Sequence, residues 1–285
     1  MTALITAKGL GKRFGKFTAL DDVNFAIEPG RIVGLIGPNG AGKTTALRAI
    51  LGLTPYTGEL RVFGQDPFEA RAKIMQDTCF IADVSVLPGW LKVSQSLDFV
   101  GGVHPKFRRE RAMALLSKTQ IRFDSRIREL SKGMKTQVHL ALAMAVDARL
   151  LVLDEPTLGL DILARRAFYD ALVNDYMDET RTILVTTHQV EEVENLLTHV
   201  MFIDRGRIVL DTPVEDIASR YVAIAVNADR LEAAKAAHPF YVRPLMGRNI
   251  LYYDNPQDPA LAGLGEVHTP TIADLFVAKL SRGAA

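Results

Sequence analysis

The hydrophobic positions of the chain alternate between short continuous runs and longer stretches with helical spacing. Three runs, at 31–37, 148–155 and 181–188, are almost wholly apolar, which is typical of strands buried on both faces. The stretches 163–179 and 189–200 instead repeat their apolar residues with the period of a helix. Strands that alternate with helices predict a mostly parallel sheet with helices on both faces.

Other segments follow different patterns. The first thirty residues and 58–64 predict hairpin-type strands, and the stretch from Val200 to Thr212 predicts two short strands around a turn at 205–207. Residues 84–147 contain several helical patterns and no clear strand. We therefore expect a helical insertion between two strands of the α/β core.

Composition limits the possible classes of function. The 285 residues are 48 % hydrophobic, enough for a sizeable core, and 34 basic residues nearly balance 33 acidic ones. Proteins that grip nucleic-acid phosphates are usually more basic. Cys79 is the only cysteine and lies in an apolar run, so we expect a buried, unreactive thiol. No signal peptide or membrane span is recognisable, which predicts a soluble chain that reaches a membrane only through a partner.

Three polar groups each follow one of the predicted buried strands. They are the segment that begins at Gly37, the pair Asp154 and Glu155, and His188. Because ligands of open parallel sheets bind at the carboxyl ends of the strands, we expect these groups to meet at one edge. Their convergence indicates a binding site there.

The segment from Gly37 to Thr44 fits G-x-x-x-x-G-K-[ST], the phosphate-binding P-loop. Its glycines let backbone N–H groups surround a phosphate, and the following helix adds the positive end of its dipole. We expect Lys43 to reach the terminal phosphates and Thr44 to offer its hydroxyl to Mg²⁺. The flanking strand and helix, which the motif requires, argue against a merely flexible turn. The predicted nucleotide-binding residues are Gly37, Pro38, Asn39, Gly40, Ala41, Gly42, Lys43, Thr44 and Thr45.

Two adjacent carboxylates, Asp154 and Glu155, end the strand "LLVLDE". Acids are common where a strand meets solvent, but in a chain with a P-loop they favour a catalytic role. Asp154 would hold Mg²⁺ directly or through water. Glu155 would orient or deprotonate the water that attacks the γ-phosphate.

Two further features have both a structural and a functional interpretation. His188 at a strand end is either an ordinary structural residue or a contact of the γ-phosphate. Ser131 is a good N-cap, and Gly133 allows close approach at the start of an apolar helix. That helix is either simply capped or a second anion site, and its spacing alone does not decide.

Taken together, these motifs resemble the ATP-binding subunit of ABC (ATP-binding cassette) transporters. The resemblance covers roughly residues 2–212 and rests on the P-loop, the signature "LSKGM" at 130–134, "LLVLDEPTLGLD" at 150–161, and His188. It implies a P-loop NTPase (RecA-like) α/β core with an antiparallel β subdomain, a helical subdomain at about 84–147, and a small C-terminal α+β appendage at 213–285.

The resemblance also implies roles for individual residues. Phe14 matches the aromatic that stacks on adenine, and Glu155 and His188 match the catalytic pair. In the family's head-to-tail dimer, Asp161 would lie at the seam between two subunits. The signature residues would touch the nucleotide of the opposite subunit: Ser131, Lys132, Gly133 and Met134.

The sequence departs from the family pattern at two places. Asp83 stands where a glutamine usually meets Mg²⁺ and the membrane partner, so Thr44, Asp154 and Asp83 form the expected magnesium set. In the signature, Lys132 and Met134 replace the usual glycine and glutamine. A signature of this type resembles subunits of bacterial exporters of the ABC-2 kind.

Two regions carry weaker expectations. Trp90 lies beside Pro88 and Gly89 and either forms a groove for a cytoplasmic helix of a permease or fills a local core. Residues 213–285 contain no chemical motif, so this appendage is either a regulatory or dimer-stabilising cap or a purely packing element.

Two functions remain at this point. The first is the ATP-hydrolysing engine of a membrane transporter, an exporter by its signature. It would use ATP and Mg²⁺, pair with a second copy or a homologous subunit, and bind a separate permease at the cytoplasmic face of the membrane. The second is a soluble ABC ATPase that acts on nucleic acid or the ribosome. We favour the first, and expect no nucleic-acid partner, because the chain has no basic excess, zinc-binding cysteines or second cassette.

Overall fold

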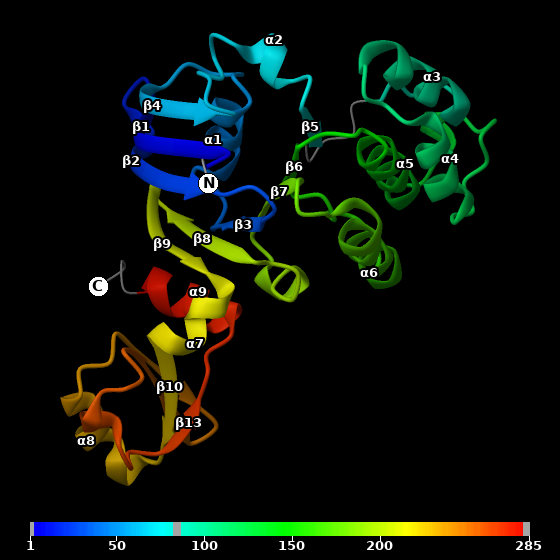
Figure 1. The fold of residues 1–285 in the computed structure, drawn as a ribbon. Helices are drawn as coiled ribbons and strands as arrows, with labels where there is room; N and C mark the ends of the chain where they lie inside the picture. Colours follow the sequence, from blue (N-terminus) through cyan, green and yellow to red (C-terminus); the bar gives the residue numbers. More distant parts are fainter. Residues whose placement is uncertain (1–2, 82–86, 282–285) are drawn as a thin grey trace.

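The computed structural model describes residues 3–81 and 87–281, which form three β-sheets and several groups of helices (Figure 1). The central sheet has six strands in the order β5-β6-β7-β3-β8-β9. Five of them run parallel, and β9 pairs antiparallel with β8. Their bounds are β3 Ile32–Ile36, β5 Thr78–Ile81, β6 Leu150–Asp154, β7 Thr182–Thr187, β8 His199–Asp204 and β9 Arg207–Pro213. The predicted α/β core is thus confirmed.

The central sheet is buried on both faces because its apolar strands alternate their side chains between two clusters. On β3, Ile32 and Ile36 join the cluster that contains α6 (Ile162–Ala171). Val33 and Leu35 of the same strand join the cluster around α1 (Lys43–Ile50). This arrangement fixes where β3 ends and the P-loop begins.

A three-stranded antiparallel sheet covers α1 and carries the aromatic hairpin, in which Phe14 and Phe17 pair across the turn. Its order is β2-β1-β4, and its bounds are β1 Ile5–Phe14, β2 Phe17–Ile27 and β4 Thr57–Val62. The hairpin strands predicted in the first thirty residues and at 58–64 are confirmed. A short helix, α2 (Arg71–Ile74), leads from this sheet to β5.

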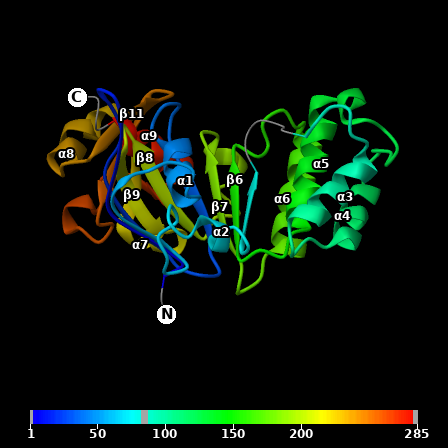
Figure 2. The same cartoon turned by 90° about the horizontal axis from the view of Figure 1, so that it is seen from above.

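The helical insertion forms a helical body beside the sheet, as the view from above shows (Figure 2). Three of its residues, Leu140, Ala143 and Met144, also join the main core. The helical body contains α3 Val93–Val103, α4 Arg109–Ser117 and α5 Lys132–Met144. These helices share their own hydrophobic cluster, which includes Leu97, Leu116 and Val138. The prediction of helices within 84–147 is therefore confirmed, while residues 82–86, with Asp83, lie outside the described residues.

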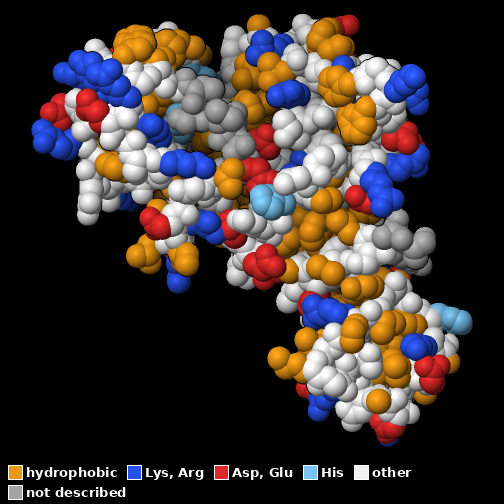
Figure 3. All heavy atoms as spheres, turned by 180° about the vertical axis from the view of Figure 1, so that it is seen from behind, with side chains coloured by type: hydrophobic (Ala, Val, Ile, Leu, Met, Phe, Trp, Pro, Cys, Tyr) orange, Lys and Arg blue, Asp and Glu red, His pale blue; other side chains and the backbone are white. Residues whose placement is uncertain are grey.

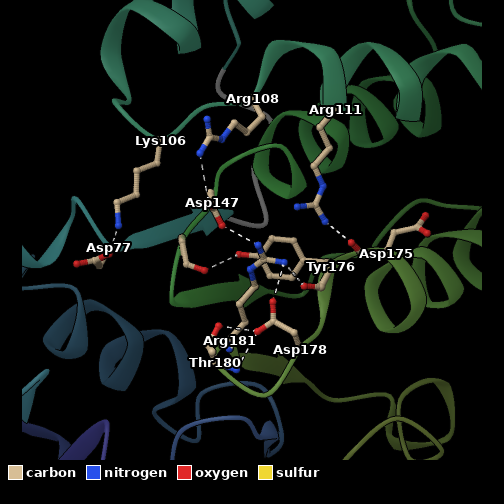
Figure 4. A network of polar contacts seen from close by, with 11 residues as sticks. Asp77, Lys106, Arg108, Arg111, Asp147, Asp175, Tyr176, Asp178, Thr180 and Arg181 are labelled. Carbon is tan, nitrogen blue, oxygen red and sulfur yellow. Dashed lines mark hydrogen bonds and ion pairs between the residues drawn. The ribbon is translucent and has the colours of Figure 1, made fainter.

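Charged side chains attach the helical body to the sheet at its rim (Figure 4). Lys106 forms an ion pair with Asp77, next to β5. Arg108 lies 3.6 Å from Asp147, which precedes β6. The members of both pairs are partly exposed to solvent, so each pair contributes little alone.

Tyr176 forms a second, buried attachment between the two bodies (Figure 4). Its ring is fully buried, and two guanidinium groups lie near it: Arg111 of α4 at 5.2 Å and Arg181, next to β7, at 5.0 Å. Arg111 also donates to the Asp175 carbonyl oxygen. Burial, and then the neighbouring Arg181, lowers the pKa of Arg111. A π-helical turn, Leu172–Tyr176, extends α6 and places this ring.

The helix predicted for 189–200 is wrong. Only Val190–Glu192 forms a short 3-10 turn (η3), and β8 begins at His199. Pairing with β3 overrides the helical pattern, since the Ile32 amide donates to the Thr198 hydroxyl at 2.9 Å. Val190 and Val193 are buried in the main core without a helix.

The C-terminal segment builds a four-stranded antiparallel sheet in the order β11-β12-β10-β13. It projects from the core as a distinct lobe (Figure 3). The strands and helices are α7 Ile217–Arg220, β10 Tyr221–Val226, α8 Leu231–Ala236, β11 Tyr241–Leu245, β12 Arg248–Asp254, β13 Glu266–His268 and α9 Ile272–Ser281. The α+β composition expected for the appendage is present.

Helix α9 lies between this lobe and the main core. Leu275 is fully buried among core residues, and Phe276 meets Phe202 of β8 edge-on, with ring centroids 5.3 Å apart. On its other side, Ala278 packs with Ala223 and Tyr252 of the C-terminal sheet. The appendage therefore completes the core rather than hanging from a linker.

Two smaller expectations also have an outcome. Cys79 packs partly buried against the main core, and burial raises the pKa of its thiol to about 12, as expected for an unreactive side chain. Within residues 3–81 and 87–281, every helix is too short or too polar to cross a membrane.

Candidate nucleotide-binding site

The P-loop connects the end of β3 to the start of α1 at Lys43. Gly42 has φ 113°, a conformation that favours glycine. A Cβ added at Gly42 would lie 2.6 Å from the Ala19 carbonyl oxygen, and one at Gly37 would lie 2.4 Å from that of Ile203. Two of the motif's glycines are therefore required by close contact with β2 and β8, apart from any contact with phosphate.

The loop borders a hollow of about 300 Å³ at the carboxyl edge of the central sheet. Lys43 is buried there, and its ammonium donates to the Gly37 carbonyl oxygen at 2.7 Å and lies 3.5 Å from Glu155. The hollow thus brings a buried cation close to the carboxylates of Asp154 and Glu155. Its lining residues are Phe17, Ala19, Pro38, Asn39, Gly40, Gly42, Lys43, Thr44, Thr45, Asp154 and Glu155.

Asp154 is buried between two threonine hydroxyls. Thr44 donates to one carboxylate oxygen at 3.1 Å, and Thr186 of β7 donates to the other at 2.5 Å. These bonds satisfy a carboxylate that would otherwise be costly to bury. Asp154 pairs in register with Thr186, so the sheet itself sets this geometry.

Glu155 and His188 come together across the ends of β6 and β7. Nδ1 of His188 lies 2.9 Å from a carboxylate oxygen of Glu155. Glu155 has φ 47°, which is uncommon for a residue other than glycine and places its side chain at the edge of the hollow. Its amide donates to the Thr186 carbonyl oxygen at 3.1 Å, which holds this backbone conformation in place.

Oxygen ligands for a magnesium ion are available at this edge. The Thr44 hydroxyl and the Asp154 carboxylate are hard donors of the kind that Mg²⁺ prefers, with water and phosphate oxygens as its usual further ligands. The described residues contain no cluster of three or more His, Cys, Asp or Glu side chains suited to a metal. The pair therefore fits an ion that arrives with a nucleotide better than a metal held by protein alone.

The aromatic hairpin contributes Phe17 to the hollow, a residue that our sequence reasoning missed. Phe14 and Phe17 are partners across the turn, and both are exposed. Phe17 lines the hollow, whereas the ring of Phe14 lies 5.0 Å from the Lys12 ammonium. The only sequence signal for Phe17 was a second aromatic three residues after the first.

The signature residues lie outside the lining of the hollow. Ser131 caps α5 by accepting from the Met134 amide at 3.2 Å. The Lys132 side chain covers Gly159, because a Cβ added at Gly159 would lie 2.6 Å from Cε of Lys132. Asp161 likewise caps α6 through the Ala164 amide at 2.8 Å. Within one chain, these residues organise helix starts away from the P-loop.

The fold and this site define a P-loop α/β protein that binds a nucleoside triphosphate. The family model for ABC transporters matches residues 20–158. The chain belongs to this family as one of its ATP-binding, ATP-hydrolysing subunits.

Relatives and solved structures agree with this assignment. The chain is 31 % identical to Nod factor export ATP-binding protein I of Cupriavidus metallidurans, over 97 % of this chain and 97 % of that protein. It is 35 % identical to "Probable multidrug ABC transporter ATP-binding protein YbhF" of Escherichia coli, over 76 % of this chain and 38 % of that protein. A solved ATP-binding subunit of an ABC transporter superposes with TM-score 0.69 at 28 % identity, covering 75 % of this chain and 91 % of that one. The nucleic-acid alternative finds no support among these proteins.

Proposed function

We propose that this subunit drives export of a substrate through a separate permease, to which it binds at the cytoplasmic face of the membrane. The convergence of Lys43, Asp154 and Glu155 at one sheet edge carries the ATPase part. The names of the relatives, which describe Nod factor export and a multidrug transporter, support the export part.

In the proposed reaction, the P-loop amides and Lys43 bind the terminal phosphates of ATP. Bound Mg²⁺, held by Thr44 and Asp154, would neutralise charge on the phosphate oxygens. Glu155 accepts a proton from a water molecule while the water oxygen forms a bond to the γ-phosphorus. The bond from that phosphorus to the ADP oxygen then breaks. His188, 2.9 Å from Glu155, orients this carboxylate and contacts the γ-phosphate.

A second subunit completes the site in this proposal. Ser131 and its neighbours start α5 outside the hollow of their own chain, so the first amides of the helix, at Lys132 and Gly133, would be available to a nucleotide held by another copy. Asp161, at the start of α6, would lie at the seam between the two copies. The exposed residues beside it, Ile162 and Leu163, would then be covered.

The helical body is the proposed contact for the permease. Trp90 is 66 % exposed, which excludes the alternative that it fills a local core. Residues 1–212 would form the ATPase domain and 213–285 an accessory domain packed onto it. A transporter subunit of this kind is attached to the membrane only through its permease.

Two variants test this function in opposite ways. The chain is co-expressed with a candidate permease, sought as a polytopic membrane protein in the neighbouring reading frames, and ATP hydrolysis and co-purification are measured. Glu155→Gln should remove at least about 99 % of turnover, because general-base catalysis contributes roughly 10²–10⁴-fold, and should leave association with the permease intact. Trp90→Glu should lose association and retain basal hydrolysis. Hydrolysis by Glu155→Gln at the wild-type rate, or a chain that co-purifies with ribosomes or nucleic acid instead, would contradict the proposal.

A further inference from the structure

Glu192 lies four residues after His188, on the 3-10 turn Val190–Glu192. Its side chain is only 13 % exposed and does not line the hollow. A carboxylate this far from water needs donors, and three segments of the chain supply them.

The first donor comes from the loop that follows Glu155. Thr157, itself buried, donates its hydroxyl to Oε2 of Glu192 at 3.0 Å. The same hydroxyl lies 3.3 Å from the Tyr169 hydroxyl of α6. Thr157 is two residues from Glu155, so this bond fixes the loop that carries the proposed base.

The other donors come from α6 and from the residue next to His188. Arg165 of α6 forms an ion pair with Oε1 of Glu192. The Gln189 amide satisfies its hydrogen bonding only when its nitrogen faces the same carboxylate, 3.2 Å from Oε2. Glu192 therefore joins the His188 turn, the Glu155 loop and α6 through one charged group.

We propose that Glu192 is a positioning residue for ATP hydrolysis, which holds His188 and Glu155 in their 2.9 Å contact. The Glu155 backbone is held by its bond to Thr186, but His188 is partly exposed at the end of β7, so the contact between the two side chains depends on the segments that carry them. Loss of the Glu192 charge would leave Arg165 without its carboxylate partner and free the two segments to separate. This inference rests on the roles proposed for Glu155 and His188.

The test compares Glu192→Gln with Glu191→Gln, an exposed carboxylate on the same turn. We expect Glu192→Gln to lower kcat about tenfold, which corresponds to about 1.36 kcal/mol in the activation barrier. KM for ATP should stay within about twofold, since the P-loop contacts of Lys43 are untouched. Glu191→Gln should match wild type in both. Unfolding temperatures measured alongside show that each variant is folded at the assay temperature.

A second variant reaches the same network from its other side. Thr157→Val should also lower kcat, and the double variant should lose less than the product of the two single losses, because contacting residues are not additive. A Glu192→Gln enzyme with wild-type kcat would overturn the proposal. A variant in which KM for ATP changes as much as kcat would overturn it too. Wild type and Glu155→Gln are assayed in parallel: a wild type without hydrolysis refutes the ATPase function itself, whereas an active wild type with an active Glu192→Gln refutes only the positioning role.

Discussion

At the scale of single residues, the site holds its charges in place before any nucleotide arrives. The Lys43 ammonium donates to the Gly37 carbonyl oxygen, and the two carboxylate oxygens of Asp154 accept from the hydroxyls of Thr44 and Thr186. Such fixed donors and acceptors need little reorganisation during the reaction, which is how a site stabilises developing charge efficiently. The aromatic hairpin is different, because the rings of Phe14 and Phe17 are both exposed to solvent.

We expect Phe17 to form part of the surface that binds the adenine ring of ATP. Phe17→Ala should weaken ATP binding by about 1–3 kcal/mol, the usual cost of losing a base–aromatic stack. Titration calorimetry with ATP measures this, and Phe17→Tyr should restore binding because it keeps the ring. Phe68→Ala, another exposed phenylalanine, serves as the matched control.

The Phe14→Ala variant belongs in the same series, since Phe14 matches the family's stacking position. The lining of the hollow leads us to expect a smaller loss at Phe14 than at Phe17. Wild-type affinity in Phe17→Ala would contradict the assignment of this ring to the site.

At the scale of elements, much of the architecture could be predicted because it depends on local pattern. Apolar runs identified β3, β6 and β7, and the P-loop and acidic motifs placed Lys43 and Asp154 at one edge. The failure at 189–200 has the opposite cause. Val190, Val193 and Leu197 have helical spacing, yet they are buried by contacts with distant segments, including α9. Phe17 and Glu192 were missed for the same reason, since their roles depend on partners far away in sequence.

Helix α9 illustrates how strongly such a distant segment contributes to the core. Leu275→Ala removes a fully buried side chain from the cluster shared with β8, so we expect a loss of about 2–5 kcal/mol in the free energy of unfolding. Val277→Ala, on the exposed side of the same helix, should cost much less. Chemical denaturation of both variants gives the comparison. Equal, small losses would show that α9 does not complete the core.

At the scale of the whole molecule, the proposed function divides the nucleotide site between two surfaces of one chain. The P-loop hollow opens at the sheet edge, while α5 begins elsewhere, capped by Ser131. Symmetric pairing of two copies would bring each half to its complement, as isologous interfaces do. In this proposal, each site is complete only in the dimer.

Light scattering on the Glu155→Gln background tests this pairing. With ATP and Mg²⁺ this variant should have the mass of a dimer, because the nucleotide is bound and not hydrolysed. Adding Ser131→Arg should return it to a monomer, since a large cation would occupy the phosphate position at the start of α5. Ser117→Arg, on the exposed end of α4, is the control and should leave the dimer intact. A Ser131→Arg dimer would argue against a shared site.

The ion pairs and the buried contacts that attach the helical body respond differently to ionic strength. The Lys106–Asp77 and Arg108–Asp147 pairs are partly open to solvent, and at 1 M salt, where the Debye length is about 3 Å, they are largely screened. The ring of Tyr176, fully buried beside Arg111 and Arg181, has no such access to ions. Concentrated salt would thus weaken the rim ion pairs and leave the helical body in place, because Tyr176 and the buried α5 residues Leu140 and Met144 do not depend on charge.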